Sequence, residues 1–106
     1  MNFEGLRIIT EEDLESLARF LDEKLSFIGK KVNVVVNYDN FELNQQVEAK
    51  FLKMVEYNTK KYFLTSTRYS SDPFYRQLLA KKFSSIHLEK TIFSSATSAI
   101  EKIQGV

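Results

Sequence analysis

The sequence contains no cysteine and only one histidine among its 106 residues. The absence of cysteine excludes disulfide bonds, thiol nucleophiles and thiolate metal sites, and it fits a reducing cytoplasm. His87 alone cannot build a multi-histidine metal site or a familiar nucleophilic dyad, so we expect a structural or surface role for it. Three glycines and one proline leave little room for linkers, and we therefore predict one domain over residues 1–106.

An excess of charge of one sign and a long apolar run are also absent. The 15 basic and 14 acidic residues give a formal charge of +1, so there is no electrostatic reason to expect nucleic acid or an anionic membrane as a partner. No apolar run approaches the ~20 residues of a membrane span, and the first residues lack the apolar core of a signal peptide. We expect a cytoplasmic globular protein.

Hydrophobic periodicity predicts strands that alternate with helices. Val34, Val35 and Val36 are consecutive, which is typical of a central parallel strand with both faces buried. The alternation predicts the α/β class, as a single small domain with a mainly parallel sheet of about four strands and about four helices. We expect strands in residues 2–9, 32–38, 63–67 and 90–93, and helices that begin after Thr10, at Glu42, at Pro73 and after Ser94 or Ser95.

Local signals define several helix ends. Thr10 and Asp13 have the spacing of a capping box, and Gly29 is expected to end the helix that they begin. Pro73 suits the first position of a helix and follows the capping segment 70–72. The helix that begins at Pro73 is expected to bury one apolar stripe, which consists of Phe74, Leu78, Leu79 and Phe83.

Polar residues follow two neighbouring strands of the predicted sheet. The first strand ends in Asn37-Tyr38-Asp39-Asn40, and the next ends in Thr67-Arg68-Tyr69-Ser70-Ser71. Because the carboxyl ends of parallel strands lie at one edge of a sheet, where open α/β folds bind ligands, we expect the two loops to meet. The candidate interaction residues are Tyr38, Asp39, Asn40, Phe41, Arg68 and Tyr69.

Each of these residues also has an interpretation that needs no ligand. Asp39 and Asn40 are common turn residues, which hydrogen-bond their own backbone. Arg68 presents a fork of donors that suits a carboxylate or phosphate, or it forms an intramolecular pair with Asp39 or Asp72. The two tyrosines could stack on an adenine, or they cover the core at the edge of the sheet.

Familiar catalytic and nucleotide-binding motifs are missing. The sequence contains neither G-x-G-x-x-G nor G-x-x-x-x-G-K-[ST]. Glu42 is expected to open a helix, where an acidic side chain complements the helix dipole, and Glu48 and Glu56 lie among lysines on a solvated helix face. We therefore assign no catalytic residue, metal site or cofactor to this domain.

A series of short motifs runs along most of the chain. It consists of Asn2-Phe3-Glu4-Gly5-Leu6, Thr10-Glu11-Glu12-Asp13-Leu14, Gly29-Lys30-Lys31-Val32-Asn33, Val36-Asn37-Tyr38-Asp39-Asn40-Phe41, Met54-Val55-Glu56-Tyr57, Thr67-Arg68-Tyr69-Ser70-Ser71 and Ile92-Phe93-Ser94-Ser95-Ala96. The order and spacing resemble the C-terminal extension of bacterial acyl-CoA:acetate (propionate-type) CoA-transferases, which has phrases close to V-N-Y-D-x-F and V-T-R-Y-T-[TS]. Ser66 departs from the common Val, and Ser70-Ser71 replace the commoner Thr pair.

The resemblance implies a non-catalytic domain. Family transferases move CoA between carboxylic acids through a glutamyl-CoA thioester, and that glutamate lies in a large catalytic part that nothing here matches. The resemblance further implies a parent that uses CoA thioesters and a partner that is the catalytic part or another subunit, a second copy included. In the family an apolar strand precedes the segment like Asn2–Leu6, so we expect either a fragment of a longer enzyme or a stand-alone version.

Two alternatives stay open. The order of elements also resembles the STAS class of anti-sigma-factor antagonists, which are small α/β modules for contact with regulatory proteins. In that class a phosphorylatable serine commonly follows the central strand, and Asp39-Asn40-Phe41 stands at that place here. The other alternative is a small-ligand domain that uses Arg68 and Asp39 at the edge of the sheet, for example to bind an acyl-CoA phosphate.

Overall fold

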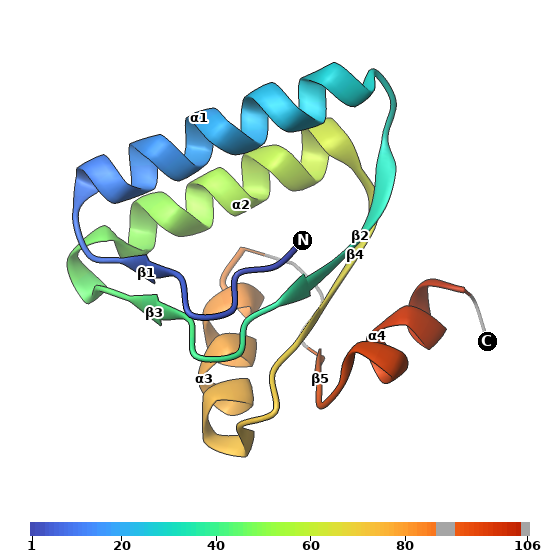
Figure 1. Cartoon of the computed structure of the whole chain (residues 1–106). Coiled ribbons are helices and arrows are strands. Elements are labelled where there is room, and N and C mark those ends of the chain that lie inside the picture. Colours follow the sequence, from blue (N-terminus) through green and yellow to red (C-terminus); the bar gives the residue numbers. More distant parts are fainter. Residues whose placement is uncertain (87–90, 105–106) are drawn as a thin grey trace.

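Parallel strands form the centre of this computed structural model, which describes residues 1–86 and 91–104 (Figure 1). One sheet has the order β2 (Val32–Asn37), β4 (Phe63–Tyr69) and β5 (Ile92–Phe93). A second parallel sheet pairs β1 (Arg7–Ile8) with β3 (Glu42–Leu43). The predicted α/β class is confirmed, with two small parallel sheets in place of one sheet of about four strands.

The first nine residues connect the two sheets. Asn2 bridges in parallel to Asn37 at the end of β2, and the amide of Phe3 donates to the carbonyl of Asn37 at 2.9 Å. Further along, the amide of Glu42 donates to the carbonyl of Leu6, also at 2.9 Å. The predicted broken strand in this segment is confirmed, and the segment hydrogen-bonds to strands of both sheets.

Helices lie on both faces of β2 and β4. The four α-helices of the described residues are α1 (Glu11–Ile28), α2 (Glu48–Tyr62), α3 (Pro73–Ser84) and α4 (Ala96–Ile103). α1 and α2 lie side by side and α2 contacts β4, while α4 contacts β2 and β4 away from α1 and α2 (Figure 1). The Thr67 hydroxyl donates to the Ala99 carbonyl of α4 at 3.0 Å, so Thr67 faces α4. Successive side chains of a strand point to opposite faces, so Arg68 faces the other side.

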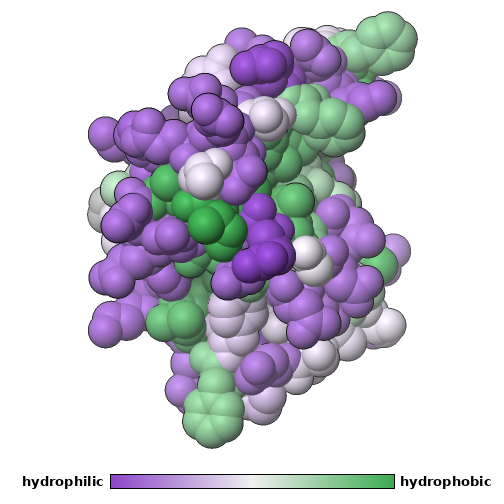
Figure 2. Space-filling model, turned by 60° about the vertical axis from the view of Figure 1, so that its left-hand side comes forward, coloured by the Kyte–Doolittle hydropathy of each residue, from purple (hydrophilic) through white to green (hydrophobic). Residues whose placement is uncertain are grey.

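Buried side chains from both sheets and the helices form one core. Val34 and Val36 are buried, whereas Val35 between them is partly exposed. The prediction that both faces of this strand are fully buried was therefore wrong. Hydrophilic side chains cover much of the surface, with hydrophobic ones between them on the face shown in Figure 2. No helix of the described residues is long and apolar enough to cross a bilayer.

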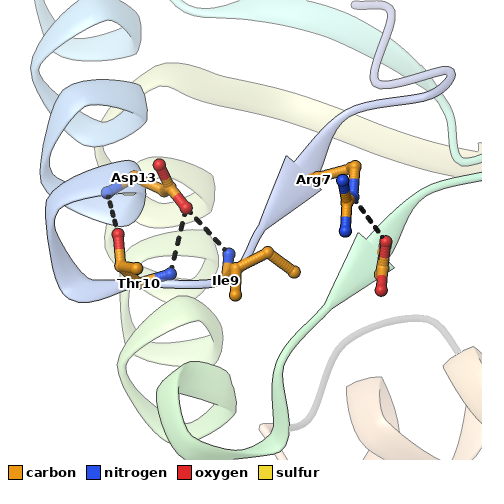
Figure 3. A network of polar contacts seen from close by, with 5 residues as sticks. Arg7, Ile9, Thr10 and Asp13 are labelled. Atoms are coloured by element: carbon orange, nitrogen blue, oxygen red, sulfur yellow. Dashed lines mark hydrogen bonds and ion pairs between the residues drawn. The ribbon is translucent and has the colours of Figure 1, made fainter.

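The predicted helix ends at α1, α3 and α4 are confirmed. The Thr10 hydroxyl accepts from the Asp13 amide at 3.1 Å, and the Asp13 carboxylate accepts from the amide of Thr10 at 3.0 Å (Figure 3). These bonds hold the pKa of Asp13 below its usual value. Gly29 ends α1 at φ 76°, a left-handed conformation that favours glycine. Pro73 opens α3, whose cap is Asp72, and Ser95 caps α4.

The start of the second helix was predicted wrongly. Glu42 lies in β3, a 3-10 turn spans Gln45–Val47, and α2 begins only at Glu48. Glu42 pairs with Arg7 of β1 at 2.7 Å across the parallel pair of strands (Figure 3). The partner strand lies about 35 residues upstream in the chain, so helical periodicity around Leu43 carried no sign of it.

The predicted buried stripe of α3 is only half buried. Leu79 and Phe83 belong to the core, whereas Phe74 is 84% exposed and Leu78 is 49% exposed. The helix therefore places its C-terminal half against the core and leaves apolar side chains of its N-terminal half in solvent. The predicted last strand began at Lys90, which lies outside the described residues, and β5 comprises Ile92 and Phe93.

Candidate functional site

The two strand-end loops meet as predicted, through Asp39 and Ser71. The Asp39 carboxylate accepts from the backbone amide of Ser71 at 2.6 Å and from its hydroxyl at 3.0 Å. These hydrogen bonds, the one from the backbone amide first, hold the pKa of Asp39 below its usual value. The Asp39 side chain thus bonds to the neighbouring loop of the same chain, and not to its own local backbone as the turn interpretation predicted.

The neighbouring polar groups of this edge are also bonded within the chain. Asp72 caps α3 by accepting from the amides of Phe74 and Tyr75, at 2.9 and 3.3 Å. Arg76 donates to the carbonyl of Ser70 at 2.8 Å. Asn40 is exposed in a left-handed turn conformation at φ 55°, which asparagine tolerates better than most residues. The carboxylates of Asp39 and Asp72 are thus bonded within the chain, while Asn40 is exposed beside them.

The structure does not place Arg68 at this edge. Arg68 lies inside β4, in register with Val36 of β2 and Ile92 of β5, and it is only 2% exposed. Among residues 1–86 and 91–104 it forms no ion pair, so the predicted pair with Asp39 or Asp72 is wrong. The expected combination of Arg68 and Asp39 in one edge site is also absent from the described residues.

Arg68 instead lies among aromatic and neutral side chains. The centre of its guanidinium is 4.5 Å from the centroid of the Phe83 ring, within the range of a cation–π contact. One terminal nitrogen donates to the Ser66 hydroxyl at 3.3 Å. The Nε atom is buried and has no hydrogen-bond partner among the described residues. An arginine stays charged in a protein, so this buried positive charge has no carboxylate partner within residues 1–86 and 91–104.

Tyr38 interacts with Arg68 through a side-chain hydrogen bond but does not supply a negative charge. It is buried, and desolvation raises the pKa of its hydroxyl to about 12, although the positive charge of Arg68 opposes this rise. The phenol is therefore neutral at neutral pH. Its ring packs edge-on against Phe3 and Phe41, with centroids 5.5 and 5.1 Å apart, which places Tyr38 and Phe41 in the core.

Arg68 and Tyr38 line a narrow cavity between the sheet and the helices α1 and α2. Its volume is about 20 Å³, enough for roughly one water-sized group. Asn58 of α2 is the one neutral amide in its lining, and the half-buried Met1 and Met54 also line it. The remaining lining is apolar and consists of Phe3, Leu21, Val36, Val55 and Phe63.

Tyr69 completes the set of predicted residues and is separate from this cavity. It is partly exposed and lies in register with Asn37 and Phe93. As the next residue of the strand after Arg68, it points to the opposite face of the sheet. The six predicted residues thus fall into three places. Asp39 and Asn40 lie at the edge, Tyr38, Phe41 and Arg68 are buried in the core, and Tyr69 lies on the opposite face.

Sequence reasoning missed three residues that matter here. Ser71 was placed in the second loop and in the capping segment but not among the candidate interaction residues, and Phe83 was predicted only as a core residue of α3. Asn58 carried a readable signal, because it continues the helical spacing of Phe51 and Val55 and is thus a polar residue on an apolar stripe.

The described residues hold no group of three or more histidine, aspartate and glutamate side chains that could bind a metal ion. Comparison of the chain with protein-family models, with curated proteins and with solved structures gives no match.

Proposed function

We propose that this chain is a non-catalytic, protein-binding domain of a cytoplasmic acyl-CoA:carboxylate CoA-transferase-like protein. In this proposal the domain contacts the catalytic part or another subunit, and it holds no cofactor while the parent uses CoA thioesters. The order of the motifs along the chain supports the family, and the internal bonding of Asp39 and Asp72 supports a domain without acid–base chemistry of its own.

The observation that carries the protein-binding role is the exposed apolar pair on α3. Phe74 and Leu78 are one helical turn apart, so they lie on the same face of α3 and form one patch. They continue the stripe whose other half, Leu79 and Phe83, is buried in the core. Aromatic side chains exposed beside an apolar neighbour are typical of protein contact sites.

The test is a precipitation of the native protein with an antibody against this domain. We expect the precipitate to transfer CoA from an acyl-CoA to acetate, and we expect the domain produced alone to transfer none. A precipitate that holds the domain but has no transferase activity would contradict the proposal. A different bound protein in that case would favour the stand-alone STAS-like alternative.

Two matched variants locate the contact. Phe74→Asp on α3 should reduce the transferase activity recovered with the tagged domain, because a carboxylate in an apolar contact loses its hydration. Phe27→Asp makes the same change on α1, where Phe27 is 92% exposed beside the exposed Ile28, and unchanged recovery with this variant assigns the contact to α3 and not to α1. Equal recovery with both variants would place the contact elsewhere.

A further inference from the structure

The side chain of Arg68 is a buried polar group that lacks both a counter-charge and one hydrogen-bond acceptor among the described residues. It is 2% exposed, its Nε–H has no acceptor among the described residues, and it lines a cavity. Buried guanidinium groups are normally matched by a carboxylate or phosphate, because an uncompensated charge in the interior is costly. The described part of the chain supplies the Ser66 hydroxyl, the Tyr38 phenol and the Phe83 ring, and all three groups are uncharged.

A neutral partner would satisfy the hydrogen bond of Nε but not the charge. Water, the Asn58 amide and the neutral Tyr38 phenol are all of this kind. A small anion satisfies both, and charge-assisted hydrogen bonds from a guanidinium are among the stronger ones in proteins. An anion bound in the cavity would therefore give Arg68 both a counter-charge and a hydrogen-bond acceptor.

The size of the cavity limits which anions fit. About 20 Å³ accommodates one water-sized group, so the CoA moiety and its phosphates are far too large. The walls are mostly apolar, with Tyr38 and Asn58 as the other polar groups, which disfavours a divalent anion. Met1 and Met54 are half-buried and flexible, so they can move to admit a group of a few atoms.

We propose that the cavity at Arg68 binds a small monovalent anion, no larger than a short carboxylate, at a site lined by Arg68, Tyr38 and Asn58. The site is distinct from the edge at Asp39, and it does not depend on the proposed transferase partner. Formate and chloride share the required size and charge, and the experiment separates them.

The first experiment observes the side-chain Nε–H signals of the ¹⁵N-labelled chain by NMR. The sequence has four arginines, Arg7, Arg19, Arg68 and Arg76, so few signals are expected, and Arg68→Lys assigns the one of interest. Sodium formate is titrated at constant ionic strength against sodium gluconate, a carboxylate too large for the cavity. We expect the Arg68 signal to shift along a saturating curve while the signals of the other three arginines stay in place.

A chloride titration in the same background tells whether the site prefers a halide or a carboxylate. Saturation by either anion supports the proposal and identifies the preferred one. An Arg68 signal that responds to neither formate nor chloride, or that responds equally to gluconate, overturns it. This readout uses the unmodified chain and so does not depend on the folding of a variant.

Thermal unfolding gives a second readout. A ligand that binds the folded state raises the unfolding temperature, so formate should raise it in the wild type and not in Arg68→Met. Arg19→Met is the matched control, since it removes the same charge at an exposed position and should keep the full response. An identical response in all three proteins would mean a general salt effect and would overturn the proposal.

Discussion

Asp39 and Arg68 follow the same pattern in sequence, a charged residue where a strand gives way to a loop, yet their surroundings differ completely. Asp39 lies two residues beyond the end of β2 and is bonded by the amide and hydroxyl of Ser71. Arg68 is still within β4 and is buried, and its Nε–H has no acceptor among the residues that the structure describes. The comparison teaches that a shift of one or two residues relative to the strand end decides whether a charge meets water or the core.

The face of the sheet to which a side chain points also determines its surroundings. Thr67 and Arg68 are adjacent, and one bonds to α4 while the other packs on Phe83 of α3. A charged residue in the middle strand of the sheet cannot avoid burial when helices cover both faces. The following predictions test how strongly each environment depends on its neighbours, from the largest expected effect to the smallest.

Removal of the ring beside Arg68 should have the largest effect. Phe83→Ala creates a cavity in the core and takes away the cation–π contact, so we expect the free energy of unfolding to fall by about 3–5 kcal/mol. Phe74→Ala, on the exposed half of the same helix, should change it by less than about 0.5 kcal/mol. Urea denaturation measures both variants, and similar losses would mean that α3 is placed wrongly.

Replacement of Arg68 should have a smaller effect of the opposite sign. In buffer free of small anions, Arg68→Met replaces a buried charge that has no ion-pair partner in the described part of the chain with an apolar side chain, so we expect the free energy of unfolding to rise by about 1 kcal/mol. The measurement is again the urea midpoint, with Arg19→Met as the surface control. A large loss of stability in Arg68→Met would mean that the fold itself provides a counter-charge.

Protonation of Asp39 should have the smallest effect. Its pKa is lowered in the folded state, so its contribution to stability is present above its usual pKa of 3.8 and is lost as the pH falls through the lower, folded-state value. Asp39→Asn keeps an acceptor for Ser71 but cannot titrate, so its stability should fall less steeply below about pH 4. Urea midpoints across this range measure the slope, and parallel slopes for the two proteins would contradict the expectation.

Sequence reasoning reached the parts of the fold that depend on near neighbours. The capping box of Thr10 and Asp13, the left-handed Gly29 and the opening Pro73 depend on residues within one or two turns, and all three were readable. The strand at Glu42 was not, because its partner is Arg7, far upstream in the chain. Local periodicity contains no information about such a partner.

The site was harder to predict than the fold for a similar reason. Tyr38 and Phe41 share a loop with Asp39, and only their packing on Phe3 and Phe51 places them in the core. Arginine is rarely buried without a partner, so its residue type argued against its actual position. Its position in the middle strand, two residues before the loop, was the feature of the sequence that could have predicted its burial.

The parallel pairing of the strands also affects how the protein folds. Every strand pairing within residues 1–86 and 91–104 is parallel, so no hairpin can form early from neighbouring segments. Each pairing must wait for a crossover helix to close a long loop, which slows folding relative to locally connected topologies. We expect Arg68 to stay hydrated until the N-terminal segment, α1, α2 and α3 have all closed around β4. The guanidinium would then lose its water in a late step of folding, and a small anion present in solution could be enclosed with it.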